Sequence, residues 1–293
     1  MNQSNVYFTK EISPESLVKI FEQLKIQLNG KVAVKLHSGE EGNQNYLKPE
    51  FVKQIIEHVN GTVVECNTAY EGERDTTEKH EKLMERHGWS KYFTVDILDS
   101  DGEETLENKN GEIIQKNIVG NKMKQYDSIL ILSHFKGHPS GGFGGAIKNL
   151  SIGLASSKGK RYIHTGGMEN ATFEEMLSSD HDSFLKSMAD SAKTITDYFG
   201  GNIAYINVMV NMSVDCDCCH VAEDPCMKDI GILASLDPVT LDQACIDLVY
   251  NAKDEGKAKL IERIESRNGL LTLECAEKQK IGSRKYNFIS IDE

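Results

Sequence analysis

Thiols are concentrated in residues 214–226, which read VDCDCCHVAEDPC. Cys216 and Cys218 form a C-x-C pair, Cys219 follows directly, and Cys226 lies seven residues further on. Thiolates bind soft and borderline metal ions and iron–sulfur clusters, so these four cysteines are candidate metal ligands. The spacing contains neither the paired C-x2-C knuckles of zinc sites nor the C-x2-C-x2-C run of ferredoxins. Three interpretations stay open: a metal site (a 4Fe-4S cluster, nickel or zinc), redox-active thiols, or a cluster without a role.

Two carboxylates lie between and beside these thiols. Asp215 and Asp217 oppose the formation of thiolates unless a cation is also present. The alternation of acids and thiols therefore favours the metal interpretation.

A second stretch, SHFKGHPSGGFGGAIKNL (133–150), combines two histidines, two lysines and five glycines directly after an apolar run. His134 and His138 are candidate catalytic residues, because histidine transfers protons near neutral pH. Lys148 is a candidate for catalysis and for cofactor binding, since a lysine can hold an anion or form a covalent adduct. Glycines let backbone amides approach a ligand, and the start of a helix, which we expect near residue 143 or 144, favours negative charge. The further candidates for cofactor binding are Gly141, Gly142, Gly144, Gly145 and Asn149.

The glycines have a simpler alternative explanation. The stretch contains no GxxxxGK[ST] and no GxGxxG, so a nucleotide-binding fingerprint is absent. A tight turn whose glycines serve only backbone geometry and packing fits the same residues.

Two histidines outside the stretch extend the set. His164 lies 16 residues after Lys148, which itself lies 10 residues after His138. His164 is a candidate metal ligand, because imidazole binds borderline metals. His37 directly follows an apolar run and is a further catalytic candidate, with an ordinary strand-end histidine as the alternative.

The elements that must position these residues alternate between strand and helix. Apolar runs at 32–36, 62–66, 92–98 and 128–132 are typical of strands, and a helical pattern at 48–61 separates the first two. This alternation predicts an α/β fold with a mostly parallel sheet and helices on both faces. Ligands bind at the carboxyl ends of such strands, which is where the 133–150 stretch begins.

The remaining segments fit one α/β domain over residues 1–293. A charged segment at 100–120 predicts a hairpin or excursion at the sheet edge, and a long helix is expected near 181–199. A strand at 202–210 precedes the thiols, and 237–252 is a helix that begins with Asp237 as N-cap and proline in its first turn. A smaller subdomain could separate near 165–200.

Composition limits the functions to consider. The net charge of −12 and the pI near 5.3 disfavour nucleic acid and anionic membrane surfaces as partners. No signal peptide or run of about 18 apolar residues is visible, and seven cysteines are an odd number for a disulfide framework. We therefore expect a cytoplasmic protein with reduced thiols that acts on a small molecule. Lys136 and Lys148 would attract an anionic one.

Three segments resemble the domain-of-unknown-function family 362. They are SHFKGHPSGGFGGAIKNLSIG (133–153), the CDC at 216–218, and DIGILASLDPVTLDQACIDLV (229–249). The resemblance implies an α/β fold and a metal- or redox-linked role. Many members also carry a ferredoxin-type insertion with C-x2-C-x2-C runs, which this sequence lacks, so its clusters cannot be assigned here.

The order of His138, Lys148 and His164 around the glycine-rich turn resembles the pattern of the nickel-pincer lactate racemases. That resemblance implies that Lys148 tethers a cofactor, that His164 ligates nickel, and that His138 transfers a proton. His37 or His134 would be the second acid or base. The CDC segment has no counterpart in the racemase pattern.

Three hypotheses follow. The first is a redox or racemase/isomerase-like enzyme whose site lies at 133–164, assisted by a metal or cluster at Cys216 and Cys218. The second is an iron–sulfur or metal-carrying protein that passes electrons to a redox partner protein, and the third is a structural zinc loop without catalysis. They differ in whether the histidines and cysteines meet in one cleft.

Overall fold

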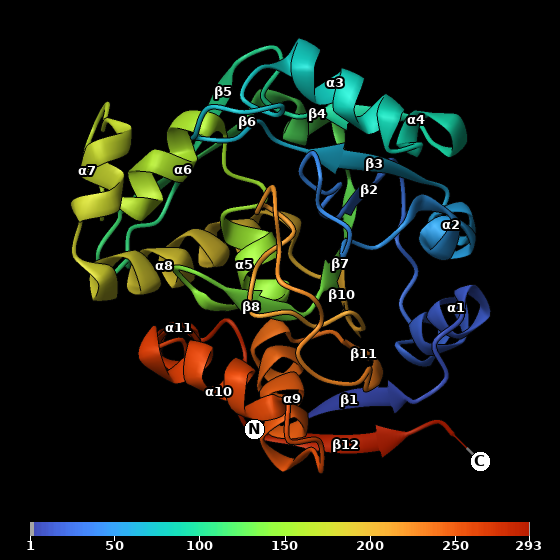
Figure 1. The fold of residues 1–293 in the computed structure, drawn as a ribbon. Helices are drawn as coiled ribbons and strands as arrows, with labels where there is room; N and C mark the ends of the chain where they lie inside the picture. The colour runs from blue at the N-terminus through green and yellow to red at the C-terminus, as the bar shows by residue number, and fades with distance from the viewer. Residues whose placement is uncertain (1–2, 293) are drawn as a thin grey trace.

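The computed structural model describes residues 3–292. Its centre is an eight-stranded sheet with the order β12-β1-β11-β10-β7-β2-β3-β4 (Figure 1). The strands are β1 (Ser4–Thr9), β2 (Val32–Lys35), β3 (Gly61–Glu65), β4 (Val95–Ile97), β7 (Ser128–His134), β10 (Ile203–Met209), β11 (Gly231–Ser235) and β12 (Tyr286–Ser290). Only β11 runs antiparallel to its neighbours, β1 and β10, and every other pairing is parallel. The expected mostly parallel sheet is confirmed.

Two small antiparallel pairs stand beside this sheet. The first joins β5 (Glu103–Glu107) to β6 (Lys116–Gly120), and it is the hairpin expected at 100–120. The second joins β8 (Lys136–His138) to β9 (Gly142–Gly144) inside the glycine-rich stretch. The helix expected to begin near residue 143 or 144 therefore begins later, at Ala146, because residues 142–144 pair with 136–138 as a strand.

Helices cover both faces of the sheet. They are α1 (Pro14–Gln23), α2 (Pro49–His58), α3 (Thr77–Arg86), α4 (Trp89–Tyr92), the 3-10 helix η1 (Asn121–Gln125), α5 (Ala146–Ser151), α6 (Ser157–His164), α7 (Phe173–Ser178), α8 (His181–Phe199), α9 (Pro238–Asn251), α10 (Lys257–Ser266) and α11 (Leu270–Lys278). The strand expected at 92–98 is shorter in the structure, because Tyr92 belongs to α4 and β4 begins only at Val95. In the part of the chain that the structure describes, no helix has the length and hydropathy of a membrane span.

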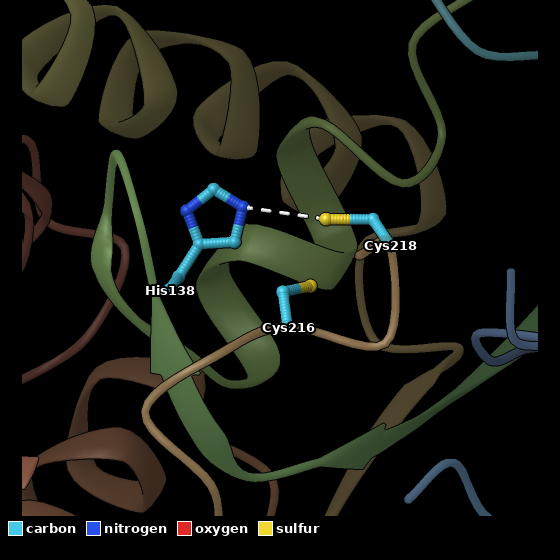
Figure 2. A group of neighbouring side chains, drawn as sticks. All are labelled: His138, Cys216 and Cys218. Atoms are coloured by element: carbon cyan, nitrogen blue, oxygen red, sulfur yellow. Dashed lines mark hydrogen bonds between the residues drawn. The ribbon is translucent and has the colours of Figure 1, made fainter. Parts of the chain in front are cut away.

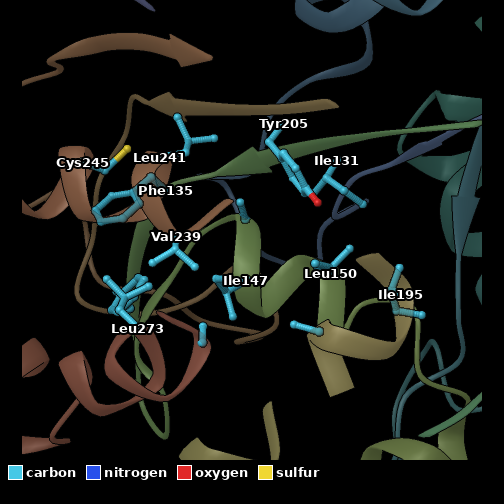
Figure 3. Close-up of a cluster of buried hydrophobic side chains, with 14 of the residues drawn as sticks. Ile131, Phe135, Ile147, Leu150, Ile195, Tyr205, Val239, Leu241, Cys245 and Leu273 are labelled. Atoms are coloured by element: carbon cyan, nitrogen blue, oxygen red, sulfur yellow. The ribbon is translucent and has the colours of Figure 1, made fainter. Parts of the chain in front are cut away.

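Two buried clusters lie on opposite sides of the sheet. Along β7, Ile129 and Ile131 pack into one cluster, and Leu130 and Leu132 pack into the other. Successive strand residues point to opposite faces, which is why this strand is apolar at every position of its centre. The first cluster includes α5, α8 and α9 (Figure 3), and the second includes α1 and α2. Each fully buried aliphatic side chain contributes about 1.5 to 3 kcal/mol of transfer free energy.

Local sequence explains where several helices begin. Ser13 caps α1 by accepting a hydrogen bond from Ser16 N at 3.1 Å, and Pro14 occupies the first turn. Asp237 caps α9 in the same way, with Thr240 N as the donor at 3.0 Å. Both proline positions lack an intrahelical bond in any case, so proline is tolerated there. The helix expected at 181–199 has those bounds.

The order of the strands selects one crevice. From β2 the chain adds β3 and β4 on one side, and later returns to add β7 and β10 on the other side. Neighbouring strands β2 and β7 therefore mark the point at which the order reverses. In open parallel sheets this is where loops separate and ligands bind, beyond the carboxyl ends of the strands.

Candidate functional site

A cavity of about 240 Å³ opens at the carboxyl ends of β2, β3 and β7. Residues from five separate parts of the sequence line it: 35–37, 65–74, 133–164, Met176 and 216–218. Those among the predicted site residues are His37, His134, His138, Gly144, Gly145, Lys148, Asn149, His164, Cys216 and Cys218. Four of the predicted histidines and two of the predicted cysteines thus meet in one cleft. This is the feature that distinguishes the enzyme hypothesis from the two others.

Cys216 and Cys218 lie beside His138 in this cavity. One nitrogen of His138 and the two sulfurs are all within 4.8 Å of one another. His138 Nε2 points toward Cys218 Sγ at 3.9 Å (Figure 2). A hydrogen bond to Cys218, together with burial, raises the pKa of Cys216 to about 11. Two neighbouring thiols suit a soft or borderline cation, which would ionise the thiols on binding.

The loop that carries these thiols is anchored by the acid between them. Asp217 Oδ1 lies 2.9 Å from His134 Nδ1, and Asp217 Oδ2 lies 2.8 Å from Lys136 Nζ. Burial opposes ionisation of Asp217, but His134 and Lys136 hold its pKa well below the usual range. His134 Nε2 faces Val210 O at 2.6 Å, so both ring nitrogens are bonded to oxygen acceptors. His134 and Lys136 therefore hold the loop of residues 216–218 (the thiol loop) in place. They also balance the negative charge of Asp217, which then opposes ionisation of the neighbouring thiols less.

The other two predicted cysteine ligands lie outside the three-donor group. Cys219 N donates to Cys216 O at 2.9 Å within a tight turn, and its side chain is not part of the cavity lining. Cys226 Sγ donates to Met212 O at 3.3 Å. A 4Fe-4S cluster held by cysteine needs four thiolates, and among residues 3–292 only Cys216 and Cys218 meet at the candidate metal site. The donors present fit one ion better than such a cluster.

His164 and His37 face the cavity from two sides. Burial and the nearby Lys148 lower the pKa of His164 to about 3, and its ring stacks on Phe184 at 4.0 Å between centroids. Burial and Arg74 lower the pKa of His37 well below the usual range, and His37 Nδ1 accepts a hydrogen bond from Gly39 N at 3.0 Å. Both imidazoles are neutral at pH 7. His164 is not in the three-donor group with Cys216 and Cys218.

Most of the cations that line the cavity are already paired. Lys35 Nζ lies 2.8 Å from Glu65, and Arg74 Nε lies 3.1 Å from Glu40. Lys148, in contrast, has no carboxylate partner in the described part of the chain, and Lys160 bonds only the carbonyl of Ala155. These two amines give the cavity a net attraction for anions.

The glycines of the 133–150 stretch serve close packing for the most part. A Cβ at Gly145 would lie 2.4 Å from Asp242 Oδ1, and one at Gly137 would lie 2.4 Å from Val214 O. Gly142 has a φ of +78° and packs on Gly269. Gly144 and Gly145 line the cavity, whereas Gly141 and Gly142 do not. A role of these glycines in cofactor binding stays a prediction.

Two groups of site residues were missed from sequence. Asp242 on α9 accepts hydrogen bonds from Ala146 N at 2.7 Å and Ile147 N at 2.9 Å, and so fixes the first turn of the helix that carries Lys148. The buried pair of Lys35 and Glu65 comes from two neighbouring strands. Each of those strands carries a single charge at its carboxyl end, of opposite sign, and this was the signal that could have revealed the pair.

Comparison with known proteins identifies the family of this chain. The profile of the family described as "Domain of unknown function (DUF362)" matches residues 32–247. No curated protein matches the sequence.

Two solved structures show a partial similarity to this chain. The lactate racemase apoprotein from Thermoanaerobacterium thermosaccharolyticum is 14% identical with a TM-score of 0.46, and 84% of this chain covers 57% of that one. A structural genomics target from Thermotoga maritima is 12% identical with a TM-score of 0.44, and 92% of this chain covers 59% of it. The chain thus spans less than two thirds of either protein, and no residue role follows from these similarities. The family profile, whose match includes both the glycine-rich stretch and the thiol loop, identifies the chain as a member of the DUF362 family.

Proposed function

We propose that this protein is an enzyme that acts on a small anionic substrate beside a single soft or borderline metal ion held by Cys216 and Cys218. The observation that carries the proposal is the convergence of both thiols, three neutral imidazoles and the unpaired Lys148 on one cavity. Perturbed and partly unpaired groups that meet in a cavity are typical of catalytic sites.

The residues divide into binding and positioning roles. Lys148 supplies the positive charge that holds the substrate, since the charges of Lys35 and Lys136 are balanced by Glu65 and Asp217. His164 is neutral and faces the same cavity, where it places an uncharged imidazole beside the substrate. A metal ion bound at the thiols would act as a Lewis acid or exchange electrons, and two protein thiolates leave coordination positions for the substrate. Redox or isomerase-like chemistry on a small acid fits this set best.

A carrier of electrons or metal is the alternative, and the position of the thiols speaks against it. Such a protein needs its metal-binding loop at the surface to reach a partner. Cys216 is only 3% exposed, and Asn43 covers the loop by donating to Cys216 O and Cys219 O. A structural zinc loop without catalysis would not require Lys148 to be left unpaired in the adjacent cavity.

Elemental analysis of anaerobically purified protein, prepared without chelator, tests the proposal. We expect about one ion of iron, nickel or zinc per chain, lost in Cys216→Ser and in Cys218→Ser. Cys226→Ser is the matched control and should keep its metal, since Cys226 lies outside the cavity. Wild-type protein that stays metal-free after incubation with Zn²⁺, Ni²⁺ and Co²⁺, or Cys216→Ser that keeps full metal, would overturn the proposal.

A further inference from the structure

The ring of His138 is held between the backbone and the thiols. On one side, its Nδ1 accepts hydrogen bonds from Ser140 N at 3.1 Å and from Gly141 N at 2.8 Å. On the other side, its Nε2 points toward Cys218 Sγ at 3.9 Å (Figure 2). The ring comes from the end of β8, and the turn that follows wraps back over it.

The two amide donors determine which nitrogen carries the proton. A neutral imidazole has one N–H and one bare nitrogen, and Nδ1 must be the bare one because two N–H groups point at it. A rotation of the ring by 180° would place a C–H against both amides and leave them unpaired, so this orientation is also fixed. A second proton on Nδ1 is excluded for the same reason. His138 is therefore a neutral imidazole with its proton on Nε2.

This tautomer bears directly on the metal site. Ligation through Nε2 requires a lone pair on Nε2 and hence a proton on Nδ1, where it would collide with the amide hydrogens of Ser140 and Gly141. We propose that His138 does not ligate the metal but donates a hydrogen bond from Nε2 to the sulfur of Cys218. The part of this inference that concerns bound metal rests on the function proposed above, and the tautomer does not.

The consequence is an electronic one. An N–H donor directed at a metal-bound thiolate draws charge from the sulfur, weakens its donation to the metal and shifts the reduction potential upward. His138 is then a positioning residue that tunes Cys218. It also cannot serve as a proton relay through its ring, since Nδ1 faces only backbone amides. This differs from the proton-transfer role expected for His138 from the racemase-like pattern.

Nitrogen NMR of ¹⁵N-histidine-labelled protein tests the tautomer. The His138 signals are assigned as those missing in His138→Gln, and long-range ¹H–¹⁵N correlations identify the protonated nitrogen. We expect the proton on Nε2 both in metal-free protein and after addition of Cd²⁺. A proton on Nδ1, or a direct ¹⁵N–¹¹³Cd coupling at Nε2, would overturn the inference.

Co²⁺-loaded variants test the effect on the thiolate. Gln keeps an N–H donor at this position and Phe does not, so the sulfur-to-cobalt charge-transfer band should shift to lower energy in His138→Phe and stay near the wild-type position in His138→Gln. Co²⁺ affinity should stay close to the wild-type value in His138→Gln, which keeps an N–H donor, and should fall by about 10- to 100-fold in His138→Phe, which removes a hydrogen-bond partner of a metal ligand. A large loss of affinity in His138→Gln would overturn the inference.

The failure of this inference is distinguishable from that of the proposed function. If wild-type protein binds no Cd²⁺ or Co²⁺, the proposed metal site is wrong, and the tautomer in metal-free protein still decides the role of Nε2. If metal binds through a nitrogen of His138, the metal site stands and the inference is wrong.

Discussion

The side-chain amide of Asn149 bonds both the ammonium group and the backbone carbonyl of Lys35. Asn149 Oδ1 accepts from Lys35 Nζ at 3.0 Å, and Asn149 Nδ2 donates to Lys35 O at 3.2 Å. The same Nδ2 also lies 3.1 Å from Ser133 Oγ on β7. One residue on α5 therefore joins the carboxyl ends of β2 and β7, the two strands at which the sheet order reverses.

Asn149→Ala should lower the free energy of unfolding by about 2 to 3 kcal/mol, because it removes these hydrogen bonds and leaves buried polar groups unpaired. Urea denaturation monitored by circular dichroism measures the loss. Asn29→Ala is the matched control, since the Asn29 side chain is exposed, and it should stay within about 0.5 kcal/mol of wild type. Equal effects of the two substitutions would contradict the bridging role.

Lys148→Ala should weaken the binding of a small anion without unfolding the protein. Charge-assisted hydrogen bonds contribute about 1.5 to 3 kcal/mol, so the dissociation constant for inorganic phosphate or malonate should rise about tenfold or more. Isothermal titration calorimetry gives this value directly. Lys158→Ala, which removes an exposed lysine on α6 from outside the cavity lining, should leave the constant unchanged. Unchanged binding in Lys148→Ala would remove Lys148 from the anion site.

Glu65→Gln should change how stability depends on pH. Burial opposes the charge of Glu65, but the cations Lys35 and Arg74 lower its pKa far below the ordinary value of 4.5. A carboxylate with a lowered folded-state pKa contributes stability that is fully present above the unfolded value, near 4.5, and is lost as the pH falls toward the folded one. The stability difference between wild type and Glu65→Gln should be constant from pH 7 to about 5.

Below that range the difference should narrow by about 1.4 kcal/mol for each pH unit. Guanidinium denaturation at a series of pH values from 7 to 3 gives the free energy of unfolding of both proteins. The contributions of the other titrating groups cancel in the difference between them. Glu81→Gln provides the control, because Glu81 is exposed, and its difference from wild type should be flat. A difference for Glu65→Gln that widens on acidification would mean that the Glu65 pKa is raised instead.

Gly137→Ala should displace the thiol loop. The added methyl group would lie 2.4 Å from Val214 O, and neither backbone segment can move aside easily, because Gly137 N already donates to Ser213 O at 2.8 Å. We expect a loss of stability of about 1 to 3 kcal/mol and weaker metal binding. At Gly201 a methyl group would meet nothing within 4 Å, so Gly201→Ala should leave both thermal stability and metal content unchanged. Normal metal content in Gly137→Ala would show that the loop tolerates the shift.

Local patterns were sufficient to predict the framework of this protein. The alternation of strands and helices, the proline-started helices at Pro14 and Pro238, and the carboxyl-edge position of residues 133–150 all follow from short windows of sequence. The orientation of β11 does not, because a strand of five residues has the same pattern in either direction. The late start of α5 was missed because glycines pair in β9 without any apolar alternation to indicate a strand.

The site itself depended on contacts between distant residues. The sequence indicated that Cys216, Cys218 and His138 were chemically capable, but only the fold brings them within 4.8 Å. Asp217 was expected to oppose ionisation of the neighbouring thiols. In the structure its negative charge is balanced by His134 and Lys136, which lie far away in the sequence. The proton position on His138 depends on the path of a three-residue turn, which no spacing rule specifies.

The placement of β1 determines when this sheet can be completed during synthesis. Residues 4–9 pair with β11 on one side and β12 on the other, so both partners of this strand are synthesised long after it. Until then β1 has an unpaired backbone on both edges, and the strands β2, β3, β4, β7 and β10 can assemble without it. The thiol loop emerges before either partner of β1 does. The residues that line the candidate site are therefore all synthesised before either partner of β1.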